Sequence, residues 1–77
     1  MDAEPPKPLS MVKAGEKVKV AVINAGRGLN SRLASMGILP NVEITVISSG
    51  WPGPLVINVK DSKVVLGRGM ADKIMVS

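Results

Sequence analysis

The side chains that could carry out chemistry in this chain are few in kind. Its 77 residues contain no His, Cys or Tyr, so the usual general bases and thiolate nucleophiles are missing. Asp, Glu, Lys and Ser remain. Carboxylates at turns and strand faces are ordinarily explained by solvation and turn hydrogen bonds, and those that follow the N-terminal segment are well separated: Glu16, Glu43, Asp61 and Asp72. We therefore expect no catalytic residues and a protein that is not an enzyme.

Metal and phosphate sites have equally little support. A transition-metal site would need imidazole or clustered carboxylates, and the sequence has neither. The stretch Gly26-Arg27-Gly28 before a helix start could bind an anion, but both Gly-x-x-x-x-Gly-Lys-Ser/Thr and Gly-x-Gly-x-x-Gly are missing from the chain. These glycines are better explained by a sharp turn from strand to helix. No metal ligand and no cofactor is expected.

Three side chains are poorly explained by a hydrophobic core and are candidates for contact with another protein. Arg27 follows a glycine, Arg32 lies off the apolar stripe of a predicted helix, and Trp51 lies in a turn bounded by prolines. Arg and Trp are common at binding hot spots. Structural alternatives remain open, because the Trp51 indole could fold over the core and the Arg32 stem could cover apolar surface. We predict that Arg27, Arg32 and Trp51 form one protein-interaction face.

A single helix, predicted near Leu29 to Met36, must position this face. Leu29, Leu33 and Met36 recur at i, i+4 and i+7, which places them on one side of a helix. Asn30 or Ser31 is expected to cap its start, and the glycine and proline that follow end it. Leu33 is predicted to lie in the core.

Alternation with period two surrounds the helix and predicts about five short strands. In the first strand, Val18, Val20 and Val22 should share the buried face. Ile47 breaks the alternation of the second strand and indicates either a bulge or an end with two apolar sides. Asp61-Ser62 should form a tight hairpin. Short connecting turns are expected over residues 9–14 and 67–72, and the strands over residues 17–23, 42–47, 55–59, 63–66 and 73–76.

The fold class that follows is mainly β: a small, partly open SH3-like barrel of about five strands, with one short helix between strands one and two. A chain of 77 residues allows one domain. We place that domain at residues 8–77, after a flexible leader of residues 1–7 without a signal-peptide pattern. The core must be aliphatic, because the chain has no Phe or Tyr and only one Trp.

Charge and apolar patterning limit the possible surroundings. The net charge of +4 could attract nucleic acid, anionic lipid or an acidic protein, but the basic residues are spread along the chain and indicate a solvated, mildly basic surface. The longest apolar run, Val20-Ala21-Val22-Ile23, is far shorter than the roughly 20 residues that span a bilayer. Together with the absence of cysteine, this favours a cytoplasmic location.

The order of these parts resembles the FeoA family, small accessory proteins of ferrous iron uptake. The outline of that family is a leading Leu and Gly, a strand, a helix with Arg-Leu-x-x-x-Gly, a Pro-led strand, a Pro-containing turn and a terminal Ile-x-Val. The resemblance covers roughly Pro8 to Ser77, and the chain supplies each part: Leu9, Gly15, Arg32-Leu33, Gly37, Pro40, Pro54 and Ile74-Met75-Val76.

The resemblance implies a non-catalytic regulatory module that binds FeoB, a large membrane transporter whose cytoplasmic part is a GTPase. It implies no small-molecule substrate and a cytoplasmic protein that its partner can hold at the inner face of the membrane; self-association stays open. One alternative is a KOW-type nucleic-acid-binding barrel, which residues 15–20 resemble, although stacking aromatics and clustered basic charge are missing. The other is the isolated SH3-like domain of an iron-dependent repressor, without its DNA-binding and metal-binding domains.

Overall fold

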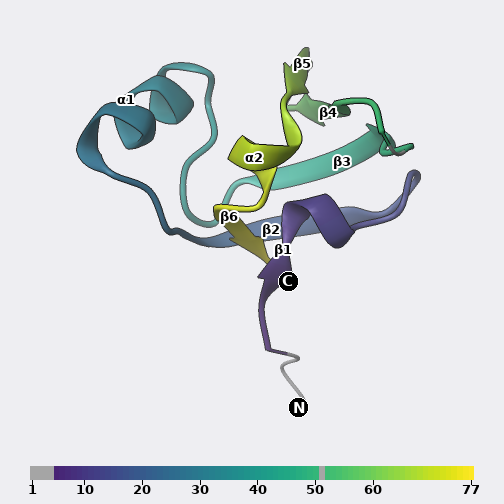
Figure 1. The fold of residues 1–77 in the computed structure, drawn as a ribbon, viewed down its shortest axis with the longest axis horizontal. Helices are drawn as coiled ribbons and strands as arrows, with labels where there is room; N and C mark the ends of the chain where they lie inside the picture. Colours follow the sequence, from purple (N-terminus) through teal and green to yellow (C-terminus); the bar gives the residue numbers. More distant parts are fainter. Residues whose placement is uncertain (1–4, 51) are drawn as a thin grey trace.

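The computed structural model describes residues 5–50 and 52–77, and it arranges them as a curled antiparallel sheet with one projecting helix (Figure 1). Six strands of these residues follow the order β1-β6-β2-β3-β4-β5. The strands are β1 (Lys7–Pro8), β2 (Lys17–Ile23), β3 (Glu43–Ser48), β4 (Leu55–Val59), β5 (Ser62–Leu66) and β6 (Ile74–Val76). The helices are the 3-10 turn η1 (Leu9–Met11), α1 (Arg27–Ser35) and α2 (Arg68–Ala71).

This arrangement confirms the predicted mainly β, SH3-like and partly open barrel, with α1 between the first two long strands. The strand missing from the prediction is β1, in which Lys7 pairs with Val76 and Pro8 with Met75. Two residues are too few to show an alternating pattern, so only the paired partner reveals this strand. The chain is therefore held to the sheet from Lys7 onward, and residues 1–4 of the predicted leader lie outside the described residues.

The core is aliphatic, as the composition requires. In β4 every second side chain is buried, and no polar or charged side chain is buried among the described residues. Each large aliphatic side chain removed from water contributes about 1.5–3 kcal/mol to folding. The residues that are almost fully buried come from every part of the fold: Leu9, Val12, Val20, Leu33, Ile38, Ile44, Val46, Leu55, Ile57, Val59, Leu66, Ala71, Ile74 and Val76.

Irregularities in two strands decide which valines face the core. The predicted bulge in β3 is confirmed, because its register with β4 shifts between Val46 and Ser48. A second shift lies in β2, between Val20 and Val22, and it was not predicted. The extra residue turns Val22 outward, so this side chain is 46% exposed while Val20 is buried. The prediction that Val22 shares the buried face is therefore wrong.

The start of α1 also differs from the prediction. The helix begins at Arg27 with Gly26 as its N-cap, so neither Asn30 nor Ser31 caps it. The Asn30 amide lies inside the first turn and donates a hydrogen bond back to the Ala25 carbonyl at 2.8 Å. Asn30 therefore ties the preceding loop to the helix, a role that resembles capping in chemistry and differs from it in position.

The end of α1 is a Schellman motif at the predicted glycine. The Ile38 N–H bonds the Leu33 carbonyl and the Gly37 N–H bonds the Ala34 carbonyl, both at 2.9 Å. Gly37 has φ +86°, in the left-handed region that side chains disfavour. Leu33 and Ile38, at the two ends of the motif, both belong to the buried core. The glycine thus turns the chain so that Ile38 enters the barrel directly after the helix.

Replacing Gly37 with alanine should lower the free energy of unfolding by about 1–2 kcal/mol, the cost of a left-handed L-residue. A new Cβ would lie 3.5 Å from Val59 Cγ1, an ordinary contact, so conformation and not crowding sets the effect. Gly28→Ala is the matched control, because this helical glycine has open space and no positive φ. Urea denaturation of both variants checks the difference, and equal midpoints would contradict the explanation.

Candidate functional site

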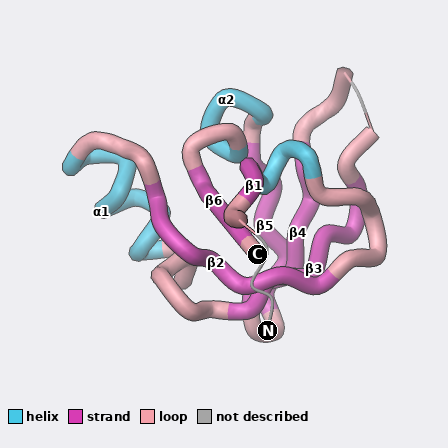
Figure 2. Tube along the Cα trace, turned by 90° about the horizontal axis from the view of Figure 1, so that it is seen from below, coloured by secondary structure: helices cyan, strands magenta, loops and turns pink. Residues whose placement is uncertain are grey.

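Helix α1 forms the most prominent surface feature and lies at one end of the barrel (Figures 1 and 2). Leu33 is its only buried residue, and the core side is completed by the half-buried Leu29 and Met36. This confirms both the predicted stripe and the core position of Leu33. Arg27 and Arg32 are exposed, and neither guanidinium has a hydrogen bond or ion pair with any residue that the structure describes. Both cations are therefore free to meet a partner.

Exposed apolar side chains lie on the chain segments that enter and leave α1. Val22 is 46% exposed at the end of β2, and Leu39 is 44% exposed in the connection to β3. These segments are held together near the helix, since the Asn41 N–H bonds the Val20 carbonyl at 2.8 Å. We call Val22, Arg27, Arg32 and Leu39 the α1 surface. It combines two unpaired cations with exposed apolar area, a composition suited to protein contact.

Trp51, the third predicted interaction residue, lies outside the described residues. Its described neighbours, Gly50 and Pro52, belong to the β3–β4 connection, which lies at the opposite end of the molecule from α1 (Figures 1 and 2). The structure therefore places Arg27 and Arg32 on the same helix, α1. The single face predicted for Arg27, Arg32 and Trp51 stays a prediction, because Trp51 is outside the described residues.

Arg68 is the residue that sequence reasoning missed. Its guanidinium donates to three backbone carbonyls, through Nε to Gly53 at 3.0 Å, through Nη1 to Ser10 at 3.4 Å and through Nη2 to Ser49. The Ser10 hydroxyl also bonds the Asp72 carboxylate. Arg68 thus joins α2 to η1 and to the β3–β4 connection. Its place between two glycines gave no sequence signal, because its partners are backbone atoms far away in the chain.

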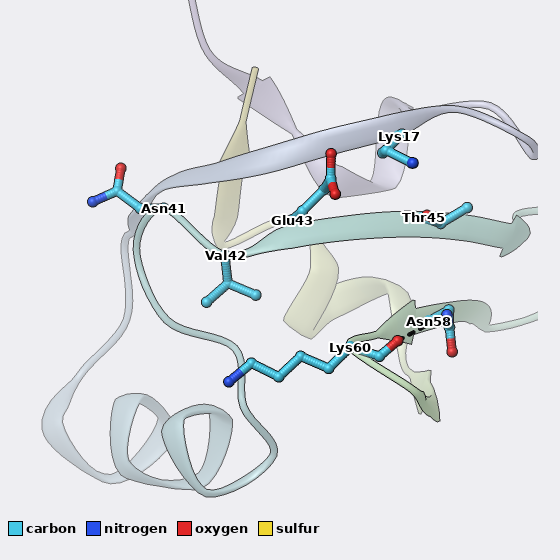
Figure 3. Close-up of a pocket in the computed structure, with 7 residues that line it drawn as sticks. All are labelled: Lys17, Asn41, Val42, Glu43, Thr45, Asn58 and Lys60. Carbon is cyan, nitrogen blue, oxygen red and sulfur yellow. Dashed lines mark hydrogen bonds between the residues drawn. The ribbon is translucent and has the colours of Figure 1, made fainter.

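A groove crosses the outer side of the sheet (Figure 3). It has a volume of about 500 Å³, and all of its lining residues except Val42 are polar or charged. Sequence reasoning missed this groove, because its residues come from β2, β3, β4 and the adjoining connections and meet only through the sheet register. The lining residues are Lys17, Asn41, Val42, Glu43, Thr45, Asn58 and Lys60.

The carboxylates do not assemble into a reactive centre in the part of the chain that the structure describes. No three of the acidic side chains there converge as metal ligands. Glu16 accepts a hydrogen bond from the Lys13 N–H at 2.9 Å, and Asp72 accepts one from Ser10. Glu16 thus has the turn-stabilising role that the sequence predicted, whereas Asp72 links α2 to η1. No helix of the described residues is long and apolar enough to cross a membrane.

The fold and these surfaces define a class: a small SH3-like β-barrel module with exposed basic surfaces. The FeoA domain profile matches residues 7–77, nearly the whole chain. A protein of Methanocaldococcus jannaschii named "Putative Fe(2+) transport protein A" is 46% identical over 69 residues, which are 90% of this chain and 83% of that protein. The chain belongs to the FeoA family, and the resemblance seen in the sequence is confirmed.

Solved structures show the same relationship in three dimensions. A crystal structure of an iron uptake regulatory protein (FeoA) has a TM-score of 0.86 and 35% identity, covering 94% of this chain and 95% of that one. A manganese-dependent transcriptional repressor also has a TM-score of 0.86, but at 24% identity, covering 99% of this chain and 43% of that chain. The second similarity concerns the fold alone. The same barrel therefore occurs both as a small protein and as part of a larger repressor.

Proposed function

We propose that this protein is a non-catalytic accessory module of ferrous iron uptake. In this role it binds the cytoplasmic part of a FeoB-like membrane GTPase transporter and regulates or assembles it. The observation that carries the proposal is membership of the FeoA family over residues 7–77. Further support comes from the relatives named for Fe(2+) transport and iron uptake regulation. The protein would act in the cytoplasm, at the inner face of the membrane where the transporter holds it.

The α1 surface is the part of the molecule best suited to this contact. Arg27 and Arg32 have no partner among the described residues, and α1 contributes only Leu33 to the buried core. The other exposed side chains of the helix are therefore not needed for packing. Arginine combined with exposed aliphatic area is typical of the centre of protein interfaces. We infer that the transporter offers an acidic patch beside an apolar one.

The proposal is tested by titrating the full chain into the purified cytoplasmic GTPase domain of the FeoB-like transporter of the same organism. Isothermal calorimetry should show a saturable complex that weakens as salt is raised, since charge steers such contacts. GTP hydrolysis is measured in the same samples, because regulation predicts a changed rate and assembly alone does not. If no complex forms with either nucleotide state of the GTPase, the proposal is wrong.

Arg32→Ala should weaken this complex by about 1–3 kcal/mol while leaving the melting temperature unchanged, as truncated hot-spot residues do. Lys13→Ala is the matched control, because it removes one exposed positive charge from the turn before β2, away from α1. Normal binding of Arg32→Ala would show that the α1 surface is not the contact. Trp51→Ala, for which a similar loss is predicted, shows in the same assay whether the contact includes the β3–β4 connection.

A further inference from the structure

The groove on the outer side of the sheet is built by cross-strand neighbours. Lys17 of β2 pairs with Thr45 of β3, and Thr45 pairs with Asn58 of β4. Ile44 of β3 pairs with Val59 of β4. Continued by one residue beyond this pair, the same register places Glu43 opposite Lys60, at the start of the β4–β5 turn. Alternate residues of a strand point to the same side of a sheet, so these side chains share the outer surface. The positions of Lys17, Glu43, Thr45 and Asn58 are fixed by the sheet, and Lys60 follows directly after β4.

The groove has a cation at each end and a carboxylate between them. In Figure 3 the Lys60 ammonium points toward the connection between α1 and β3, away from Lys17. Neither lysine, nor Glu43, has an ion pair with another residue that the structure describes. Lys17 and Lys60 are two strands and about two residues apart, which corresponds to roughly 12 Å between their Cα atoms. Two separated anionic groups would fit this pattern better than one compact anion.

Lys60 is held in a conformation that its own side chain does not favour. Its φ is +57°, in the left-handed region where Gly or Asn would be expected in a hairpin turn. The Asn58 amide stabilises this turn by donating to the Lys60 carbonyl at 3.1 Å (Figure 3). Because this bond uses only an N–H of the Asn58 amide, the side-chain oxygen makes no hydrogen bond with another described residue and can act as an acceptor. The turn thus carries a lysine where folding alone would favour another residue.

We propose that this groove binds an extended acidic segment of a partner protein. Two carboxylates of that segment, about four residues apart, would meet Lys17 and Lys60, since an extended chain advances about 13 Å over that length. The residue between them must be uncharged, because it passes Glu43. Asn41, Thr45 and Asn58 supply groups that can hydrogen-bond the backbone of the segment. A groove of about 500 Å³ is of a size that holds a few residues of such a segment.

The test is a titration of the isotope-labelled full chain with three short end-blocked peptides, followed by NMR. The first peptide has two glutamates four residues apart with valine midway, the second has glutamines in their place, and the third has a glutamate instead of the valine. The first peptide should shift the backbone amides of residues 41–45 and 58–60, and the second should not. The third should bind about threefold more weakly than the first despite its larger negative charge. If the third binds more tightly, the attraction is diffuse and the proposal is wrong.

Variants locate the binding on the groove. Lys17→Gln combined with Lys60→Gln should lower the affinity for the first peptide by about threefold to tenfold. Lys13→Gln combined with Lys73→Gln removes the same charge outside the groove lining and should change it by less than about twofold. Equal losses in both pairs would overturn the site. Lys60→Asn adds a check that keeps the turn, because asparagine tolerates the left-handed conformation; it should retain the fold and still lose affinity.

Competition with other polyanions tests whether the groove is specific for an acidic protein segment. A single-stranded oligouridylate, or vesicles with about one-third anionic lipid, should not compete with the first peptide at low micromolar concentration. If either probe bound more tightly than the first peptide, and did so through Lys17 and Lys60, the groove would be a site for that polyanion and not for an acidic segment. Peptide binding to the groove is also independent of the proposed transporter contact at the α1 surface. Arg32→Ala should bind the peptide normally. The peptide titration can therefore fail while the α1 surface still binds the GTPase domain, and the peptide can bind although the GTPase domain does not.

Discussion

Replacing Leu33 with alanine should lower the free energy of unfolding by about 2–5 kcal/mol, the range for large-to-small changes in a core. Leu33 is fully buried and is the only buried residue of α1. Its carbonyl also accepts the Ile38 N–H that ends the helix. Small domains have only about 5–15 kcal/mol of total stability, so a loss of this size would leave the barrel close to unfolding. Urea denaturation followed by circular dichroism measures it.

Binding to the transporter should be lost in Leu33→Ala only as far as the chain unfolds. Leu29→Ala is the matched comparison, because Leu29 lies on the same stripe but is half-buried and should cost clearly less. Leu33→Met keeps most of the volume and should cost less than about 1.5 kcal/mol. A Leu33→Ala protein that is as stable as the original chain would mean that α1 does not depend on its core contact. A stable variant that failed to bind would place Leu33 in the interface itself.

The parts of the fold that were predicted well are those governed by local alternation. β2 at Lys17–Ile23 and β4 at Leu55–Val59 have the predicted bounds, because one buried side fixes the register of a strand. The end of α1 was also predicted correctly, since Gly37 adopts the left-handed conformation that the cap requires. In each case the deciding interaction lies within a few residues in sequence.

The parts that were missed depend on distant partners. β1 exists because Lys7 and Pro8 pair with β6, and Val22 is exposed because of a bulge that appears only when β2 pairs with β6. The start of α1 was predicted two residues late, because Gly26 supplies the cap position and Asn30 bonds backward to Ala25. No pattern within one strand or helix contains this information.

The candidate site shows the same division. The exposure of Arg32 follows from the helical stripe, which leaves this residue on the outer side, whereas Arg27 was singled out only because it follows a glycine. The groove was not predictable, because Lys17 and Lys60 are brought to one surface only by the registers of β2 with β3 and of β3 with β4. Charge spread evenly along a sequence can therefore still be concentrated on one side of a sheet.

Arg68→Ala should lower the free energy of unfolding by about 1.5–3 kcal/mol, although Arg68 is only half-buried. Its guanidinium is bonded to the carbonyls of Ser10, Ser49 and Gly53, and hydrogen bonds to a charged group are stronger than neutral ones. Alanine would remove all three at once and release the β3–β4 connection from α2. Chemical denaturation gives the total loss, and hydrogen exchange shows whether protection falls first at this connection and at η1.

Two further variants separate geometry from charge at this position. Arg68→Lys keeps the positive charge but lacks the planar fork, so it should recover less than half of the loss. Arg32→Ala removes an equal charge from an exposed position that makes no hydrogen bond or ion pair with another described residue, and it should change stability by less than about 0.5 kcal/mol. If Arg68→Lys is as stable as the original chain, a point charge suffices and the three-carbonyl fork is not what holds the connection. If Arg68→Ala is neutral as well, the β3–β4 connection is held by its own turn, such as the Gly53 N–H bond to the Gly50 carbonyl at 3.0 Å.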